Sequence, residues 1–205
     1  MEVRFDPETL QTLHMRAGDL WRRSFSRGWQ RSAVSPMEVV RLFDRLWVRE
    51  GYELVAYIYG FEVSSLGVVW AVKEGTPTEI EECERLEDEL GTPRLCGAVE
   101  FTEVIEGDGS PESYIQASIL VRELGDFGCT FEHSDWGWHE ITGDLGEFEV
   151  FFRQIDPTPK VSLGDRPVVE FCTRSYRTGE VYRHVDEFAD GYRFTSRSEV
   201  IGFAD

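Results

Sequence analysis

The sequence has no run of apolar residues approaching the roughly 20 that a membrane-spanning helix needs. Its first residues, MEVRFDPETL, are charged at once and contain no apolar stretch that could serve as a secretion signal. A membrane protein and a secreted protein are therefore not expected. We expect a soluble, cytoplasmic protein.

Cysteine is sparse, with only Cys83, Cys96, Cys129 and Cys172 in the chain. The four are far apart, and none forms a Cys-x-x-Cys pair. Such spacing, in a chain that is not expected to be secreted, gives no support to a disulfide framework or a thiolate zinc site. We expect free thiols that are mostly packed inside the protein.

Positive charge is also scarce, with 21 Lys and Arg against 39 Asp and Glu and a net charge of −18. The first 50 residues carry nine arginines against seven acidic residues, so the negative excess belongs to the rest of the chain. An acidic surface repels phosphate backbones, and nucleic acid is therefore not expected as a partner. A basic protein or a small molecule fits this charge better.

The length of 205 residues, with 41% hydrophobic residues, suits a single compact domain over residues 1–205. The chain has no internal repeat, low-complexity tract or linker that would divide it. Global disorder is not expected, because the apolar content is that of a globular protein.

Four short stretches share one helix-start signal, a side chain that can cap the helix followed by proline. They are DPET from Asp6, SPME from Ser35, TPTE from Thr76 and SPES from Ser110. The capping oxygen accepts hydrogen bonds from free backbone amides, and proline suits the first helical position. The sequence thus predicts an N-terminal pair of helices, reaching about Phe25 and Gly51, and two later helices ending at Gly91 and Gly125.

Strand signals, rich in β-branched and aromatic residues, fill most of the remaining chain. YELVAYIYGFE and LGVVWAVKEG predict a buried hairpin, and CGAVEFTEVIEG predicts a further strand. FEVFFRQI, PVVEFCTRS, GEVYRHVDEF and YRFTSRSEVI predict a C-terminal β-meander. The fold expected is α+β, with several helices packed on a large, curled, mainly antiparallel sheet.

The stretch CTFEHSDWGWHE, residues 129–140, contains a thiol, two histidines, three carboxylates and two tryptophans. If residues 129–135 are extended, alternation places His133 and Asp135 on one face. There an imidazole and a carboxylate could hold one metal ion. His184 is the candidate third ligand, on a predicted strand within YRHVDEFADGYRFT, which also carries Arg193 and Thr195.

This pattern resembles the double-stranded β-helix oxygenases that use ferrous iron and 2-oxoglutarate. The resemblance implies that His133, Asp135 and His184 bind Fe(II). It also implies that Arg193 and Thr195 hold the far carboxylate of 2-oxoglutarate. Two imidazoles and one carboxylate leave positions open for the keto acid and oxygen. Arginine suits a carboxylate, because its planar fork can donate two hydrogen bonds.

The resemblance covers residues 131–196, and a second His-x-Asp pair, His184 with Asp186, lies within it. A structural role is the alternative for these residues. In that case His133 and His139 form hydrogen bonds within a turn, and His184 lies on a polar strand face.

Trp136 and Trp138 are two positions apart and point the same way if the chain is extended. They could form a stacking wall for a ring or a sugar. Alternatively, they close the core at the edge of a sheet.

Three functions follow as hypotheses. The first is a non-catalytic binding domain that recognises a basic protein with its acidic surface, or a small ligand in an aromatic-lined pocket. The second is the iron-dependent oxygenase. The third is an acidic inhibitor that imitates the charge of a nucleic acid, for which residues 79–89 supply a dense group of carboxylates.

Overall fold

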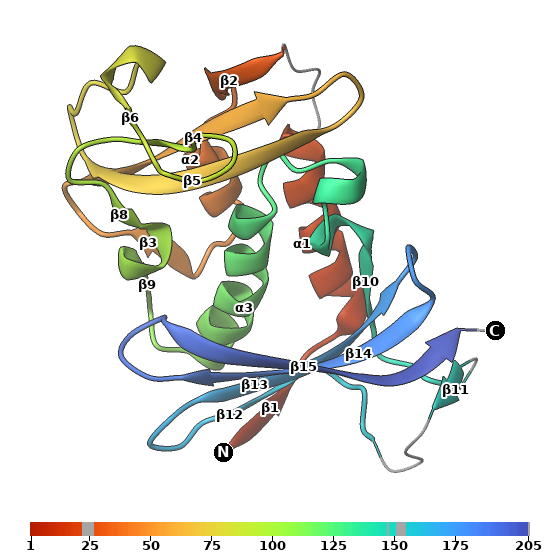
Figure 1. Ribbon diagram of the computed structural model, residues 1–205. Helices are drawn as coiled ribbons and strands as arrows, with labels where there is room; N and C mark the ends of the chain where they lie inside the picture. Colours follow the sequence, from red (N-terminus) through yellow and green to blue (C-terminus); the bar gives the residue numbers. More distant parts are fainter. Residues whose placement is uncertain (22–26, 147, 151–154, 205) are drawn as a thin grey trace.

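A computed structural model of the chain describes residues 1–21, 27–146, 148–150 and 155–204. Its elements form three layers, with helices lying between two antiparallel sheets (Figure 1). The described residues contain three α-helices: α1 (Pro7–Trp21), α2 (Pro36–Val40) and α3 (Pro111–Gly125). In this part of the chain no helix is long and apolar enough to cross a membrane.

The larger sheet has the strand order β1-β12-β13-β14-β15-β11. A further strand, β10, pairs with the second half of β13, on the edge where β12 pairs with the first half. The predicted C-terminal meander is confirmed for its last three strands, because β13, β14 and β15 pair in sequence order. The first predicted strand, FEVFFRQI, instead pairs with β15 through residues 148–150, and its residues 151–154 lie outside the described residues. The bounds are β1 (Glu2–Arg4), β10 (His139–Thr142), β11 (Phe148–Val150), β12 (Lys160–Ser162), β13 (Val168–Ser175), β14 (Glu180–Phe188) and β15 (Phe194–Ala204).

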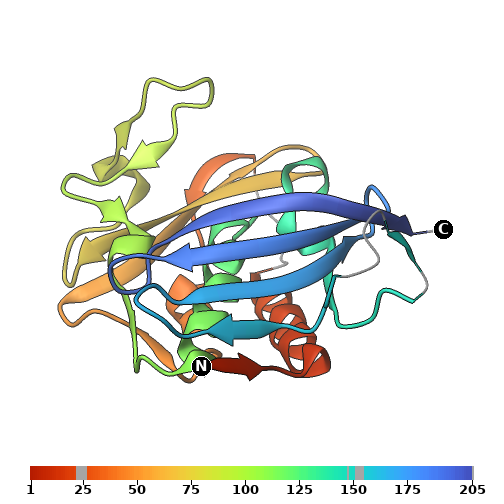
Figure 2. The ribbon, with the colours of Figure 1, turned by 90° about the horizontal axis from the view of Figure 1, so that it is seen from below.

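The smaller sheet has the order β2-β4-β5-β8 and is built on the predicted hairpin, which is confirmed. Its bounds are β2 (Gly28–Arg31), β4 (Tyr52–Gly60), β5 (Ser65–Lys73) and β8 (Val99–Glu100). Two further pairs are β3 (Leu46–Val48) with β9 (Ile105–Gly107), and β6 (Glu84–Arg85) with β7 (Pro93–Arg94). The β6–β7 hairpin projects from the body of the protein (Figure 2).

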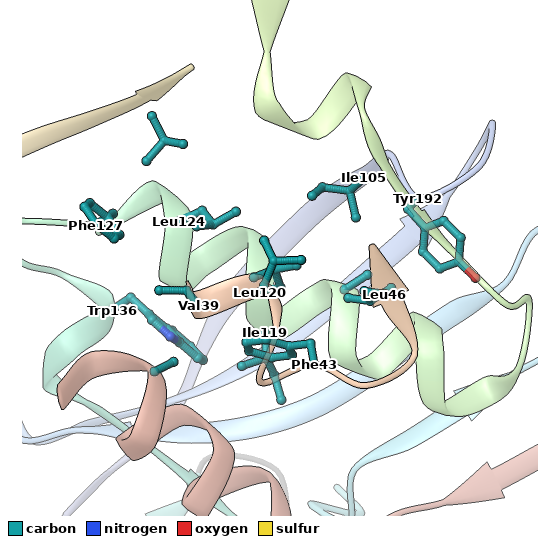
Figure 3. Packing of buried hydrophobic residues seen from close by; sticks show 14 of the residues in the cluster. Val39, Phe43, Leu46, Ile105, Ile119, Leu120, Leu124, Phe127, Trp136 and Tyr192 are labelled. Carbon is teal, nitrogen blue, oxygen red and sulfur yellow. The ribbon is translucent and has the colours of Figure 1, made fainter. Parts of the chain in front are cut away.

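Helix α3 is the centre of the hydrophobic core. Its buried residues include Ile115, Ile119, Leu120 and Leu124, and they belong to one cluster with residues of both sheets. Figure 3 shows Ile119, Leu120 and Leu124 together with Val39 and others from neighbouring segments. A helix with apolar side chains on several sides is stable only when other elements of the protein pack against those sides. Packing between two sheets meets that need.

Three of the four predicted helix starts are confirmed. Asp6, Ser35 and Ser110 each accept a hydrogen bond from a backbone amide two or three residues later. The helix predicted from Ser110 ends at Gly125 as expected. The helix predicted from Asp6 is described to Trp21, and its predicted continuation to Phe25 lies outside the described residues.

The prediction of several helices on a curled sheet was wrong, because two predicted helices do not form as expected and the sheets are not curled. The helix from Ser35 stops at Val40, and Leu46 and Trp47 instead belong to strand β3. Pairing of β3 with β9, far along the chain, overrides the helical spacing of the apolar residues.

The helix predicted from Thr76 is replaced by a 3₁₀ turn, Ile80–Glu82, and the β6–β7 hairpin. The Thr76 hydroxyl donates to the Lys73 carbonyl oxygen at 2.7 Å and does not cap a helix. Seven acidic residues lie between positions 79 and 89, and a helix would place many of them three or four residues apart. Like charges at that spacing destabilise a helix.

Candidate functional site

The stretch Cys129–Asp135 is not extended, so the condition for placing His133 and Asp135 on one face is not met. Residues Phe131–His133 form a 3₁₀ turn, and Trp136–Trp138 form another. Phe131 has a φ of 53°, a left-handed conformation that ends strand alternation. The reason for placing His133 and Asp135 on one face is therefore lost.

The three predicted metal ligands are not gathered around one point. His133 stacks on Phe61, with ring centroids 4.7 Å apart. His184 is buried on β14 and lines a cavity that Asp135 also borders. Among the described residues, no three His, Cys, Asp or Glu side chains are placed to hold a metal ion. The ligand set implied by the oxygenase resemblance is not assembled.

Arg193 and Thr195, the predicted 2-oxoglutarate anchor, are both exposed. Phe194 and Ser196 line the cavity beside His184, so strand alternation directs Thr195 to the opposite face. Arg193 precedes β15 and borders a separate hollow near Tyr192. Neither residue joins the His184 cavity.

Trp136 and Trp138 do not form one stacking wall, because the 3₁₀ turn separates their rings. Trp136 is buried, and its Nε1–H donates to Glu123 Oε1 at 2.7 Å. Trp138 is 37% exposed and lines a different cavity, of about 420 Å³. Only Trp136 reaches the cavity of His184.

This cavity has a volume of about 400 Å³ and is bordered by α3, the Trp136–Trp138 turn, β10, β14 and β15. Its lining combines aromatic, hydroxyl, imidazole and charged groups. Among them are Arg122, Asp135, Trp136, His139, His184 and Ser196. Convergent polar groups in a hollow with aromatic walls are typical of a small-molecule site.

A chain of hydrogen bonds runs beneath the cavity. His139 Nδ1 lies 2.7 Å from Thr173 Oγ1, which lies 2.8 Å from His184 Nε2. His184 Nδ1 lies 2.8 Å from Ser198 Oγ. The Thr173 hydroxyl has one hydrogen, and that hydrogen is satisfied within the chain of hydrogen bonds when Thr173 donates to one imidazole and accepts the N–H of the other.

The second ring nitrogen of His139, Nε2, has no hydrogen-bond partner among the described residues. The side chain is 7% exposed and borders the cavity. Nε2 is not one of the fully buried atoms that lack a partner, so solvent can reach it. A group bound in the cavity can supply the missing partner.

The two imidazoles linked by these hydrogen bonds, His139 and His184, are held neutral. Burial lowers the pKa of His184 well below its usual value, and the nearby charge of Arg122 lowers it further. Burial also lowers the pKa of His139, although Asp135 partly opposes the shift. Neutral rings can each donate one hydrogen bond and accept another.

Arg122 is fixed in place by Asp186, which is 0% exposed. The two guanidinium nitrogens donate to the two carboxylate oxygens at 2.7 and 2.9 Å, and one also donates to Ser196. The guanidinium lies 5.1 Å from the Phe171 ring centroid and 5.8 Å from that of Phe194. Its charge is therefore neutralised within the protein.

A second buried pair joins α1 to α3. His14 Nε2 donates to the His139 carbonyl oxygen at 2.9 Å, because a carbonyl can only accept. His14 Nδ1 lies 2.5 Å from Glu123 Oε1, so one proton is shared between these two atoms. Burial raises the pKa of Glu123. The pair fixes the strand that carries His139 against both helices.

Sequence reasoning missed His14, Arg122 and Glu123. The available signal was a polar residue within an apolar stripe, since His14 follows Leu10 by one helical turn. Buried polar groups need partners, so one polar residue within an apolar stripe indicates that another polar residue is buried beside it. The pair His184 and Asp186 was noticed, and both side chains do lie inside, although not as metal ligands.

Comparisons with protein-family models, with curated proteins and with solved structures gave no match to this chain. The function must therefore be argued from the chemistry of the cavity, since a fold alone does not specify one.

Proposed function

We propose that this protein binds a small polar molecule in the cavity between α3 and strands β14 and β15. The observation that carries the proposal is His139, a residue that lines the cavity and whose Nε2 has no hydrogen-bond partner among the described residues. The polar groups around it are held in fixed positions by Thr173, His184 and Ser198. A preorganised site loses less conformational entropy when its ligand binds.

The composition of the cavity supports the same proposal. Trp136 stacks on His139 with ring centroids 5.6 Å apart, and Phe194 borders the cavity from β15. These rings give apolar contact, while Ser196 and Ser198 offer hydroxyl groups. Apolar walls supply affinity and a few polar groups fix the ligand's orientation.

A basic protein partner stays a prediction. The acidic residues between positions 79 and 89 are exposed, and most lie on or beside the projecting β6–β7 hairpin (Figure 2). Such charge would speed the association of a basic protein and make the rate sensitive to salt.

A screen of soluble fragments tests small-molecule binding. The library contains amines, carboxylic acids and neutral amides, and the indole N–H signal of Trp136 is followed by NMR. We expect a subset of fragments to shift this signal. If fragments of all three classes leave it unchanged at millimolar concentration, the proposal is wrong.

A matched pair of glycine variants tests whether the fragments bind in the cavity. Gly125 borders the cavity and has open space around the position of an added Cβ atom. Gly125→Leu should therefore reduce fragment binding at least tenfold by occupying the cavity. Gly164 is also unstrained, with its nearest atom 3.9 Å away, and lies outside the cavity lining. Gly164→Leu should leave binding unchanged.

A further inference from the structure

The positive charge in the cavity is not available to a ligand. Arg122 is the only arginine or lysine in the described lining, and both of its bonds to Asp186 are shorter than 3.0 Å. Aromatic rings and Ser196 occupy its remaining surroundings. An anionic ligand would have to compete with the buried Asp186 carboxylate for the guanidinium.

The two imidazoles do not supply positive charge either. His139 and His184 are both neutral at physiological pH, because burial disfavours their charged forms. Cavity-facing cations are thus absent from the part of the lining that the structure describes, apart from the neutralised Arg122.

Negative charge is available at the rim. Asp135 is exposed and borders the cavity, and its carboxylate has no hydrogen bond or ion pair with any described residue. Asp135 and His139 both line this cavity, and the negative charge of Asp135 opposes the lowering of the His139 pKa. Asp126, in contrast, is buried and its carboxylate accepts hydrogen bonds from Ser134 and Gly137.

The carboxylate of Asp135 and Nε2 of His139 are therefore two acceptor groups, without partners among the described residues, on side chains that line one cavity of about 400 Å³. The second position is independent of charge, since it is a ring nitrogen that has no hydrogen-bond partner among the described residues. Trp136 adds an aromatic wall beside both. An ammonium group has three N–H donors and is attracted to carboxylates and to aromatic rings.

We propose that the ligand is a small organic cation, a protonated primary amine, whose ammonium group donates to Asp135 and to Nε2 of His139. This inference rests on the proposed small-molecule function and names the chemical class of the ligand.

Binding of an amine also fixes the direction of the hydrogen-bond chain. If His139 Nε2 accepts from the ammonium group, the proton of His139 lies on Nδ1 and is donated to Thr173. Thr173 then donates to His184 Nε2, and His184 Nδ1–H donates to Ser198. A ligand that accepts a hydrogen bond from His139 Nε2–H would reverse every step.

Three probes of similar size test the inference with the full chain: benzylamine, benzyl alcohol and benzoate. Binding is measured by NMR titration at pH 7 and at constant ionic strength. We expect benzylamine to bind at least tenfold more tightly than the other two. Equal or tighter binding of benzoate would overturn the amine assignment while leaving small-molecule binding intact. If no probe and no library fragment binds, both proposals fall.

A matched pair of variants tests the role of Asp135. Asp135→Asn removes the free carboxylate and should weaken benzylamine binding at least tenfold. Asp165→Asn changes the net charge equally at an exposed position outside the cavity lining, and should change binding less than twofold. Equal effects of the two substitutions would show that Asp135 does not contact the amine.

The ring nitrogens of His184 give a separate readout, because nitrogen-15 chemical shifts distinguish a protonated nitrogen from a bare one. With benzylamine bound, we expect the proton of His184 on Nδ1. Thr173 links His139 to His184 by hydrogen bonds, so the polarity of the ligand at His139 sets the expected position of the His184 proton. A His184 proton on Nε2 in the benzylamine complex would contradict the proposed orientation.

Discussion

The charge of the buried ionisable side chains near the cavity is set by a paired side chain or by burial. Arg122 is paired with Asp186, and Glu123 shares a proton with His14. His184 has no charged partner and is kept neutral by burial. Because charges are costly to bury without compensation, these pairings decide which groups remain free to meet a ligand.

The neutral state of His184 predicts a dependence of stability on pH. Its pKa in the folded protein lies below the unfolded value of about 6.5, so the unfolded state binds more protons in acid. The contribution of His184 to the free energy of unfolding is complete above pH 6.5 and is lost as pH falls below it. The slope reaches at most about 1.4 kcal/mol per pH unit for one histidine.

Urea denaturation of the wild type and His184→Gln at pH 5, 6 and 7 measures this effect. We expect a shallower loss of stability toward pH 5 in the variant. The raised pKa of Glu123 has the opposite effect on the free energy of unfolding, which it increases as pH falls. This contribution is present in both proteins and cancels in the comparison. Identical pH profiles would show that His184 is not held neutral.

Among the elements, α3 and the loop after it connect the two sheets. The loop packs so closely on β5 that an added Cβ atom at Gly67 would lie 2.0 Å from the backbone oxygen of Phe127. Ser65 reinforces this contact, because its hydroxyl donates to the Gly128 carbonyl oxygen. The position of the smaller sheet on α3 therefore depends on the absence of a side chain at residue 67.

Gly67→Ala should lower the free energy of unfolding by about 3 kcal/mol, because backbone atoms on both sides must separate. Gly164→Ala is the control, since its nearest atom is 3.9 Å from the added Cβ. Its effect should stay within about 0.5 kcal/mol. Denaturant unfolding compares the two variants, and a Gly67→Ala protein as stable as the control would refute the close contact.

At the scale of the whole molecule, the net charge of −18 makes self-repulsion a general cost. The β6–β7 hairpin and the 3₁₀ turn before it carry a dense part of this charge away from the core (Figure 2). Asp88 has a local structural role, since its carboxylate accepts from the backbone amides of Leu90 and Thr92. The glutamates around it have no such role in the turn.

Substituting four of these glutamates by glutamine, at positions 81, 82, 87 and 89, should raise the melting temperature at low ionic strength. The gain should shrink in 1 M salt, where charges are screened over about 3 Å. The four Glu→Asp substitutions keep the charge and serve as the control. A gain that persists in 1 M salt would mean that repulsion is not its cause.

The sequence alone determined the features that depend on neighbours along the chain. Caps at Asp6, Ser35 and Ser110 form because the capping oxygen and the free amides lie within three residues. The β4–β5 hairpin and the C-terminal meander form because their strands are joined by short turns. The acidity of the surface also follows directly from composition.

Tertiary structure decided the rest, because its contacts join residues far apart. Strand β3 exists through its pairing with β9, and helical spacing could not reveal that partner. The cavity brings together Arg122, Asp135, His139 and His184 from four segments, each with a local pattern that allowed other roles. A buried polar group is stabilised by whichever partner folding places beside it, so its role is settled only when the layers pack.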